Sequence, residues 1–264
     1  MTVVDAGTVP HRISASGQWW ALTVRGLAGM TRSGEVLFAL ISPAFLAICF
    51  YLPLRSIMDS APGMNYAQFL MPIITLQAVG FMASSAAMRS AFDGAKGIST
   101  RFRTMPMPSW VPVAARLSVN AVLLAISLAC ATVASLVIGW RPEGGISGTV
   151  GLFTVAAAVG VLVAVLADAV GLLAGSPEAT SQALSLPILI LGMLSTGFVP
   201  ENRFPDWIAP FVRNQPISQF ATAMRALNDG TGTRDVLMPS VWWCVGLAVV
   251  AAVLMALGVR KMGR

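Results

Sequence analysis

The sequence predicts an all-α polytopic membrane protein with six transmembrane helices, and three observations lead to this prediction. First, hydrophobic residues make up 56% of the 264 residues and charged residues 11%, whereas a soluble domain is about 45 to 50% apolar and about 25% charged. Second, the charges cluster between uncharged apolar runs. Third, each run is long enough for a helix to cross a hydrocarbon core of roughly 30 Å.

Six apolar runs are the predicted spans, and we expect them to form a single domain over residues 1–264. They cover residues 36–54, 66–87, 112–138, 150–174, 183–199 and 238–259. No short apolar core with a cleavage site precedes the first run, so no secretory signal is expected. The third run is longer than one crossing needs. Its beginning, with Arg116 and Asn120, is expected at the membrane interface or in the cytosol.

The distribution of Lys and Arg predicts the orientation in a bacterial plasma membrane. Eleven of the 17 basic residues lie in the N-terminal segment, in the connection after the second run with its entry into the third, and at the C-terminus. The other six lie in the remaining loops, together with six acidic residues. Because positively charged loops stay inside, we expect a multi-pass protein with both termini in the cytoplasm.

Residues 16–31 predict an amphipathic helix ahead of the first span. Apolar side chains recur at helical spacing from Trp20 onward, and Arg25 lies on another face. Such a helix lies along the inner leaflet, with Trp19 and Trp20 at headgroup depth. The alternative is an extension of the first span that bends at a glycine such as Gly34.

Residues 89–110 form a basic connection, rich in Gly and Pro, on the predicted cytoplasmic side. A short helical turn is expected to present Arg101, Phe102 and Arg103, and Pro106 then ends it. An aromatic side chain between two arginines is typical of a knob that enters a groove on a partner. The alternative is that positive-inside topology alone accounts for these charges.

Residues 200–235, between the fifth and sixth runs, are too apolar for a plain loop. They contain two apolar clusters, one of them at helical spacing, that are too short to cross the membrane. Several prolines punctuate the segment. We therefore expect a re-entrant or surface helical hairpin in the outer interface.

The chain carries no motif for catalysis or for phosphate binding. Its one histidine, His11, lies in the N-terminal tail, where it cannot activate a serine within the membrane. No H-E-x-x-H zinc motif and no phosphate-binding loop occurs, so we expect no enzyme activity, no metal site and no cofactor. The three cysteines are expected to be small buried hydrophobes. Since the basic residues flank spans, nucleic-acid binding is not expected.

Asp168 is the one carboxylate inside a predicted span. Ala156, Gly160 and Ala164 precede it at intervals of four, a stripe of small residues that permits close helix contact. A charge in hydrocarbon is costly, so Asp168 is expected to face the bundle interior, water or a partner. It is either a contact for substrate or protons, or a structural hydrogen-bonding group.

Two blocks of the sequence resemble the ABC-2 family of ATP-binding-cassette exporter permeases, in particular the daunorubicin-resistance type. One is FDGAKGISTRFRTMPMPSWVPVAARL, similar to the family's loop between spans two and three. The other is STGFVPENRFPDWIAPFVRNQPISQFATAMRALNDG, similar to the end of span five and the outer hairpin. The importer loop E-A-A…G is not matched, because Leu184 stands where its glycine would be. The resemblance therefore implies export and the ABC-2 exporter fold.

The resemblance also implies roles for individual residues. Seven residues would belong to the coupling element that docks on a separate ATPase subunit: Asp93, Gly97, Arg101, Phe102, Arg103, Met105 and Pro106. Residues Trp19, Trp20 and Arg25 would lie on the connecting helix beside it. The outer hairpin would carry Pro200, Pro205, Trp207, Pro216 and Arg225. Asp168 is not part of the family's pattern.

The function implied by the resemblance is that of a transmembrane subunit of an ATP-driven exporter. Two copies of an ATPase subunit would bind ATP and Mg, and a second permease would complete the pathway as a homodimer or heterodimer. The cargo would be amphipathic: a drug, a polyketide or a cell-envelope lipid. Two alternatives stay open, an ATP-independent carrier or channel that uses Asp168, and a membrane anchor that only recruits an ATPase.

Overall fold

The computed structural model of the protein describes residues 14–58, 65–98, 101, 104–108, 110–174 and 176–262, the last four of them by backbone only. Within these ranges every regular element is a helix. The elements in chain order are α1 (Ala15–Ser33), α2 (Glu35–Met58), α3 (Tyr66–Ala95), α5 (Trp110–Ile138), α6 (Gly145–Leu173), α7 (Pro177–Met193), η1 (Glu201–Arg203), α8 (Ala209–Asn214), α9 (Pro216–Asn228) and α10 (Arg234–Met262).

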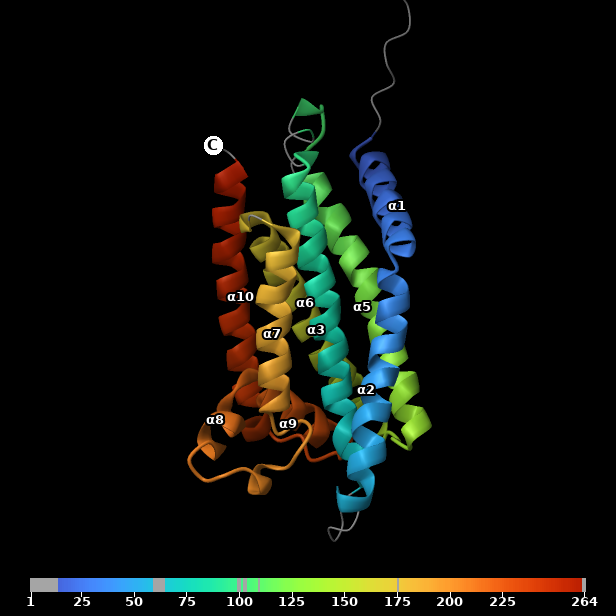
Figure 1. Cartoon of the computed structure of the whole chain (residues 1–264), viewed down its shortest axis with the longest axis vertical. Helices are drawn as coiled ribbons and strands as arrows, with labels where there is room; N and C mark the ends of the chain where they lie inside the picture. Colours follow the sequence, from blue (N-terminus) through green and yellow to red (C-terminus); the bar gives the residue numbers. More distant parts are fainter. Residues whose placement is uncertain are drawn as a thin grey trace, which may run out of the picture.

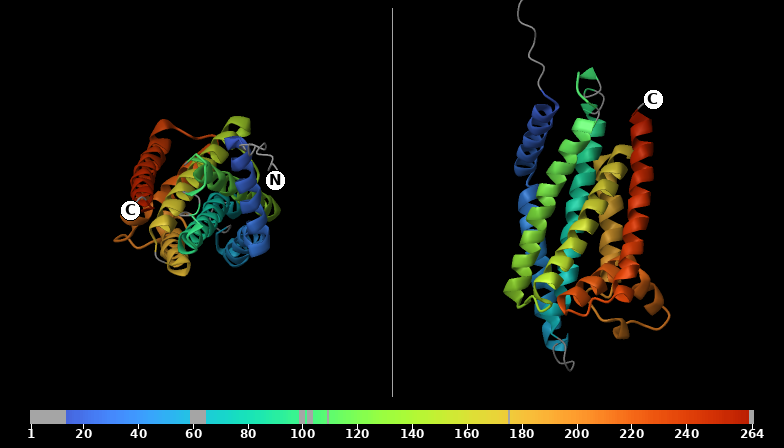
Figure 2. Two further views of the ribbon diagram at one scale, coloured as in Figure 1. Left: turned by 90° about the horizontal axis from the view of Figure 1, so that it is seen from above. Right: turned by 180° about the vertical axis from the view of Figure 1, so that it is seen from behind.

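The long helices run side by side along the long axis of the molecule (Figure 1). Helix α3 is central and packs against α2, α5, α6 and α7, and α10 packs against α6. The short helices α8 and α9 lie at one end of the bundle, whereas α1 and the last turns of α10 lie at the other (Figures 1 and 2). The two ends of the bundle therefore carry different elements, and the long helices connect them.

Within the described residues, five helices, α2, α3, α5, α6 and α10, are long and apolar enough to cross a membrane. Helix α7 has 17 residues, about 25 Å at 1.5 Å per residue, and is shorter than these five. The prediction of the fifth run at residues 183–199 was wrong in its bounds. Helix α7 begins at Pro177 because the Ser176 hydroxyl accepts a hydrogen bond from the amide of Ala179, 3.2 Å away, and caps the helix.

Helix α3 extends further than predicted. The run was expected to end at residue 87 and the basic connection to begin at Arg89, but the helix continues through Arg89 and Asp93 to Ala95. The prediction was wrong because the guanidinium of Arg89 finds partners on neighbouring helices, Glu35 on α2 and Asn120 on α5. Helix α3 ends where Gly97 adopts a positive φ of 64°, a conformation that glycine adopts readily.

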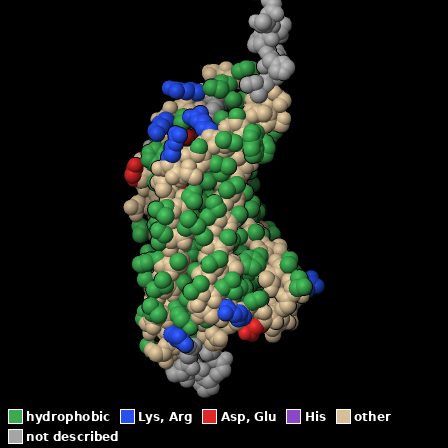
Figure 3. All heavy atoms as spheres, turned by 90° about the vertical axis from the view of Figure 1, so that its right-hand side faces the viewer, with side chains coloured by type: hydrophobic (Ala, Val, Ile, Leu, Met, Phe, Trp, Pro, Cys, Tyr) green, Lys and Arg blue, Asp and Glu red, His purple; other side chains and the backbone are tan. Residues whose placement is uncertain are grey.

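A belt of apolar side chains surrounds the bundle between its two ends. Figure 3 shows one face, on which Lys, Arg, Asp and Glu appear only towards the two ends. Large apolar side chains point outward, such as Val137 at 81% exposure and Leu52 at 69%. Cys49 is also exposed and Cys130 and Cys244 are half-buried, so the prediction of buried cysteines was wrong. These positions face outward where a bilayer would surround the protein.

A helix over residues 16–31 is confirmed as α1 (Ala15–Ser33), whereas its predicted place along the inner leaflet stays a prediction. The Ser14 hydroxyl caps its first turn, and Gly34, with φ 78°, separates it from α2. Helix α1 lies alongside α5 (Figures 1 and 2). Gly26 permits this close approach, because a Cβ added there would lie 2.6 Å from Cγ2 of Val119 on α5. The chain bends at Gly34, and beyond this bend α1 continues along the bundle from α2, which is the geometry of the alternative, an extension of the first span bent at a glycine.

Candidate functional site

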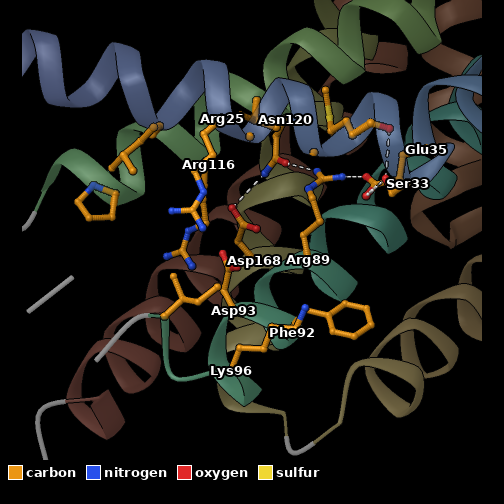
Figure 4. Close-up of a pocket in the computed structure, with 18 residues that line it drawn as sticks. Arg25, Ser33, Glu35, Arg89, Phe92, Asp93, Lys96, Arg116, Asn120 and Asp168 are labelled. Carbon is orange, nitrogen blue, oxygen red and sulfur yellow. Dashed lines mark hydrogen bonds and ion pairs between the residues drawn. The ribbon is translucent and has the colours of Figure 1, made fainter. Parts of the chain in front are cut away.

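A pocket of about 330 Å³ lies at the end of the bundle where α1 meets α3, α5 and α6. Figure 4 shows that charged and polar side chains from these helices, and from the first turn of α2, point into it. We call it the charged pocket. Seven charged residues line it: Arg25, Glu35, Arg89, Asp93, Lys96, Arg116 and Asp168.

The floor of the charged pocket is a chain of polar contacts that we call the inner network: Glu35, Arg89, Asn120 and Asp168. Arg89 forms an ion pair with Glu35 and donates a hydrogen bond from Nη2 to Oδ1 of Asn120, 2.6 Å away. The Nδ2 group of Asn120 donates to Oδ2 of Asp168 at 3.0 Å. Dashed lines follow this chain in Figure 4. The inner network thus connects α2, α3, α5 and α6.

Local sequence features bring these four side chains together. The bend at Gly34 starts α2 at Glu35, where an acidic side chain favours the first turn of a helix. Helix α6 approaches α3 closely because Gly171 has no side chain: an added Cβ would lie 2.6 Å from Cβ of Ser90 and closer still to the carbonyl oxygen of Ala87. The hydroxyl of Ser90 donates to the carbonyl oxygen of Asp168 at 2.9 Å.

Four further charged residues surround the opening, and we call them the mouth cluster: Arg25, Asp93, Lys96 and Arg116. Asp93 interacts electrostatically with Arg116, Arg25 and Lys96, and Arg116 also acts on Asp168. In Figure 4 the side chains of Arg25 and Arg116 lie beside those of Asp93 and Asp168. Arg25 and Lys96 are exposed, so the mouth cluster faces the outside of the bundle.

The charged pocket brings together residues that the sequence assigned to different roles. Asp168 was expected to face the bundle interior, and with 4% exposure it does so. Arg25, predicted on the connecting helix, and Asp93, predicted in the coupling element, line the same pocket. The stripe of small residues before Asp168 is indeed a packing face, since Ala156 and Ala164 are buried.

Glu35 and Asn120 were not predicted from the sequence as partners of Arg89 and Asp168. Asn120 lies one helical turn after Arg116 on α5, and both point towards the pocket. Two polar residues four apart within an apolar run are a signal that could have paired this face of α5 with Asp168. Among the residues that the structure describes, no group of three or more His, Cys, Asp or Glu side chains could hold a metal ion.

The predicted coupling element begins at Asp93 within the last turn of α3 and continues beyond the end of that helix. The amide of Arg101 donates to the carbonyl oxygen of Gly97 at 3.1 Å, and residues 98, 101 and 104 have helical backbone, as expected for the short turn. Met105, at 47% exposure, and Pro106 face outward. Phe102 and Arg103 lie outside the described residues. The element starts beside the charged pocket, since Ile98 lines it.

The two tryptophans of α1 have different surroundings. Trp19 donates from Nε1 to the hydroxyl oxygen of Ser118 on α5, 3.1 Å away. Trp20 is 60% exposed. Trp19 therefore fastens α1 to the bundle, while Trp20 points away from it.

At the opposite end of the bundle, Arg225 on α9 holds the short helices to α3. Its Nε donates to the carbonyl oxygen of Phe69 at 3.1 Å and its Nη2 to that of Gly197 at 2.9 Å. The guanidinium also lies 3.6 Å from the ring centroid of Phe69, a cation–π contact. Burial lowers the pKa of Arg225 to about 9, and Asp229 opposes this effect, so Arg225 stays a cation at neutral pH.

The other predicted residues of the outer segment begin or precede short helices, accept backbone hydrogen bonds, or lie at the surface. Pro216 begins α9 and Pro200 precedes η1. The carbonyl oxygen of Pro205 accepts hydrogen bonds from the amides of Ile208 and Ala209. Trp207 is 81% exposed. The segment therefore consists of short helices, η1, α8 and α9, joined by turns.

Comparison with known proteins identifies relatives along nearly the whole chain. The ABC-2 type transporter family profile matches residues 17–227. The doxorubicin resistance ABC transporter permease protein DrrB of Mycobacterium tuberculosis is 37% identical, over 94% of this chain and 90% of that protein. The daunorubicin resistance ABC transporter permease protein DrrB1 of Streptomyces coeruleorubidus is 31% identical, over 94% and 85%. The probable permease DrrC of Mycobacterium tuberculosis is 26% identical, over 73% and 69%.

Proposed function

Since this chain belongs to the ABC-2 type transporter family, we propose that it is the transmembrane subunit of an ATP-driven exporter for an amphipathic drug, polyketide or cell-envelope lipid. A separate ATPase subunit, in two copies, supplies the energy, and a second permease completes the pathway. The observation that carries this proposal is the similarity to drug-resistance permeases over nearly the full length of the chain. Doxorubicin, which appears in the name of one of these relatives, is the first cargo to test.

The proposed topology has six spans with the charged pocket on the cytoplasmic side. Helix α7 supplies the fifth of these spans, since it packs alongside α3 and the amide of Thr196, just after it, donates to the hydroxyl of Ser218 on α9. Its length of about 25 Å matches a bilayer that thins locally. The short helices then cap the outer side of the pathway. This orientation leaves the basic coupling element in the cytoplasm.

The proposed mechanism transmits force through α3. ATP brings the two ATPase subunits together, and their contact with the coupling elements shifts a pair of permeases between inward-facing and outward-facing states. Because α3 is a continuous helix from Tyr66 to Ala95, a displacement of the coupling element reaches the centre of the bundle. The inner network would carry the same displacement to α2, α5 and α6.

Reversing the charge of the coupling element tests this mechanism. The variant Arg101→Glu, Phe102→Ala, Arg103→Glu is expected to reduce copurification with the ATPase by at least about a hundredfold, because like charges facing each other cost several kcal/mol. The ATPase is expected to be encoded in a neighbouring reading frame. The measurement is the amount of ATPase recovered with the affinity-tagged chain from membranes.

The control is Arg203→Glu, the same charge reversal at an exposed position on the opposite end of the bundle. This control should recover the ATPase at the level of the unmodified chain. Equal recovery with the coupling variant and with the control would show that these residues do not dock the ATPase.

The carrier hypothesis is tested with Asp168→Asn in proteoliposomes. If the exporter proposal is right, doxorubicin transport requires the ATPase, and this variant lowers ATP-driven transport by less than about tenfold, because an amide side chain can still bond with Asn120. Transport by the unmodified chain without an ATPase, lost in Asp168→Asn, would instead support the carrier. ATPase binding with no transport at all would favour the membrane anchor.

A further inference from the structure

We propose that the mouth cluster binds the phosphate group of an anionic phospholipid from the adjacent membrane leaflet. The site consists of Arg25 on α1, Lys96 after α3 and Arg116 on α5, which all line the charged pocket, with the Lys96 ammonium 5.5 Å from the centroid of the Phe92 ring. Lipid binding at this site does not require that the protein is an exporter. It requires only that this end of the bundle lies at a membrane surface.

The charges of the pocket are divided unevenly between its floor and its opening. The inner network contains one cation, Arg89, and two carboxylates, which bond to Arg89 and Asn120. The mouth cluster contains three cations and one carboxylate, Asp93. The floor therefore repels an anion, whereas the opening attracts one. A ligand with its charge at one end fits this division if the charge stays at the opening.

Arg116 gives the most direct support for a bound phosphate. Its Nε atom is buried and, among the described residues, has no hydrogen-bond partner. A buried donor without a partner costs about 1 to 3 kcal/mol, and a phosphate oxygen is an acceptor that matches a guanidinium well. A phosphate held between Arg116 and Arg25 would satisfy this donor.

The walls of the pocket favour a lipid over a soluble phosphate. Leu22, Ile98 and Pro112 line it beside the cations, and Phe92 is both a lining residue and 37% exposed. The volume of about 330 Å³ is at the small end of the range for ligand pockets. The pocket therefore has room for a headgroup and the first part of an acyl chain. Basic pockets between transmembrane helices are known to bind anionic headgroups.

The test measures binding of phosphatidylglycerol to the purified full-length chain in detergent micelles. Phosphatidylcholine and inorganic phosphate serve as parallel ligands, and lipid affinity is read from native mass spectrometry and from the lipid-induced shift of the thermal unfolding midpoint. We expect phosphatidylglycerol to bind most tightly, because choline adds a positive charge next to the phosphate, and inorganic phosphate to bind weakly, because it gains nothing from the apolar walls.

Three variants separate a built site from general attraction to a charged surface. Arg25→Gln and Lys96→Gln should each lower the affinity for phosphatidylglycerol about fivefold, and Asp93→Asn should raise it by a similar factor. A gain of affinity in Asp93→Asn cannot result from misfolding. The matched control is Arg32→Gln, which removes an exposed arginine from the last turn of the same helix but outside the pocket, and should leave the affinity unchanged.

Other outcomes would overturn the proposal. Equal losses in Arg25→Gln and Arg32→Gln would mean diffuse attraction of lipid to α1 rather than a site. Equal binding of the two phospholipids, or no response to Asp93→Asn, would remove the role of the mouth cluster. Stabilisation by inorganic phosphate with the same dependence on the variants, without any by phosphatidylglycerol, would assign the site to a soluble phosphate.

Discussion

Replacing Arg89 with methionine is expected to destabilise the protein by about 3 to 5 kcal/mol, because it leaves buried carboxylates without their cation. Arg89 pairs with Glu35 and bonds to Asn120, which in turn bonds to Asp168. Losing one side chain therefore affects contacts among four helices. The measurement is the thermal unfolding midpoint of the purified chain in detergent, together with the fraction that stays monodisperse.

A second substitution separates loss of the charge pair from loss of packing. Adding Glu35→Gln to Arg89→Met removes the unpaired carboxylate and should recover a large part of the lost stability, since removing both members of a buried pair costs less than removing one. The control Arg32→Met removes an exposed arginine of α1 and should change stability by less than about 0.5 kcal/mol. If Arg89→Met were as stable as the Arg32→Met control, the inner network would contribute nothing to the stability of the protein.

Replacing Gly171 with leucine is expected to separate α3 from α6. Even a Cβ at this position would lie 2.6 Å from Cβ of Ser90 and against the backbone carbonyl oxygen of Ala87. A backbone atom cannot rotate out of the way as a side chain can, so the two helices would have to move apart. Overpacking by a few atoms costs about 1 to 3 kcal/mol, and a whole leucine side chain should exceed this range. The displacement would also break the hydrogen bond from Ser90 to the carbonyl oxygen of Asp168.

The matched control for Gly171→Leu is Gly246→Leu on α10, where an added Cβ meets no atom within 4 Å. This variant should keep the unfolding midpoint of the unmodified chain or raise it slightly, because leucine favours a helix more than glycine does. Both variants are compared by thermal unfolding in detergent. Similar midpoints for the two would contradict the close contact between α3 and α6.

The positions of the long helices could be predicted from the sequence because they depend on local properties. An apolar run of sufficient length forms a helix that buries all its backbone hydrogen bonds, so α2, α5 and α10 lie close to their predicted runs. Helix α7 deviates because its beginning is set by a Ser–Pro cap that apolarity does not reveal. Its last predicted residues, such as Gly197 and Phe198, form turns instead of helix.

The charged pocket could be predicted only in part, because it depends on contacts between distant residues. Asp168 was recognised as a residue in need of a partner, but nothing local identifies Asn120, 48 positions earlier in the chain, as that partner. Arg89 was assigned to a solvated loop, since the hydrogen bonds that retain it within α3 come from other helices. Lys and Arg counts thus predicted which end is basic, but not which of these charges are buried.

The one-residue joint at Gly34 restricts how α1 can move. Because only this glycine separates α1 from α2, α1 cannot slide along the bundle and can only swing about the joint. A helix of 19 residues is about 28 Å long, so a swing of about 10° would move its Ala15 end by about 5 Å while Ser33 stays nearly fixed. Spectroscopic labels placed near Ala15 and on α5 would therefore register such a rotation with far greater sensitivity than labels next to the joint.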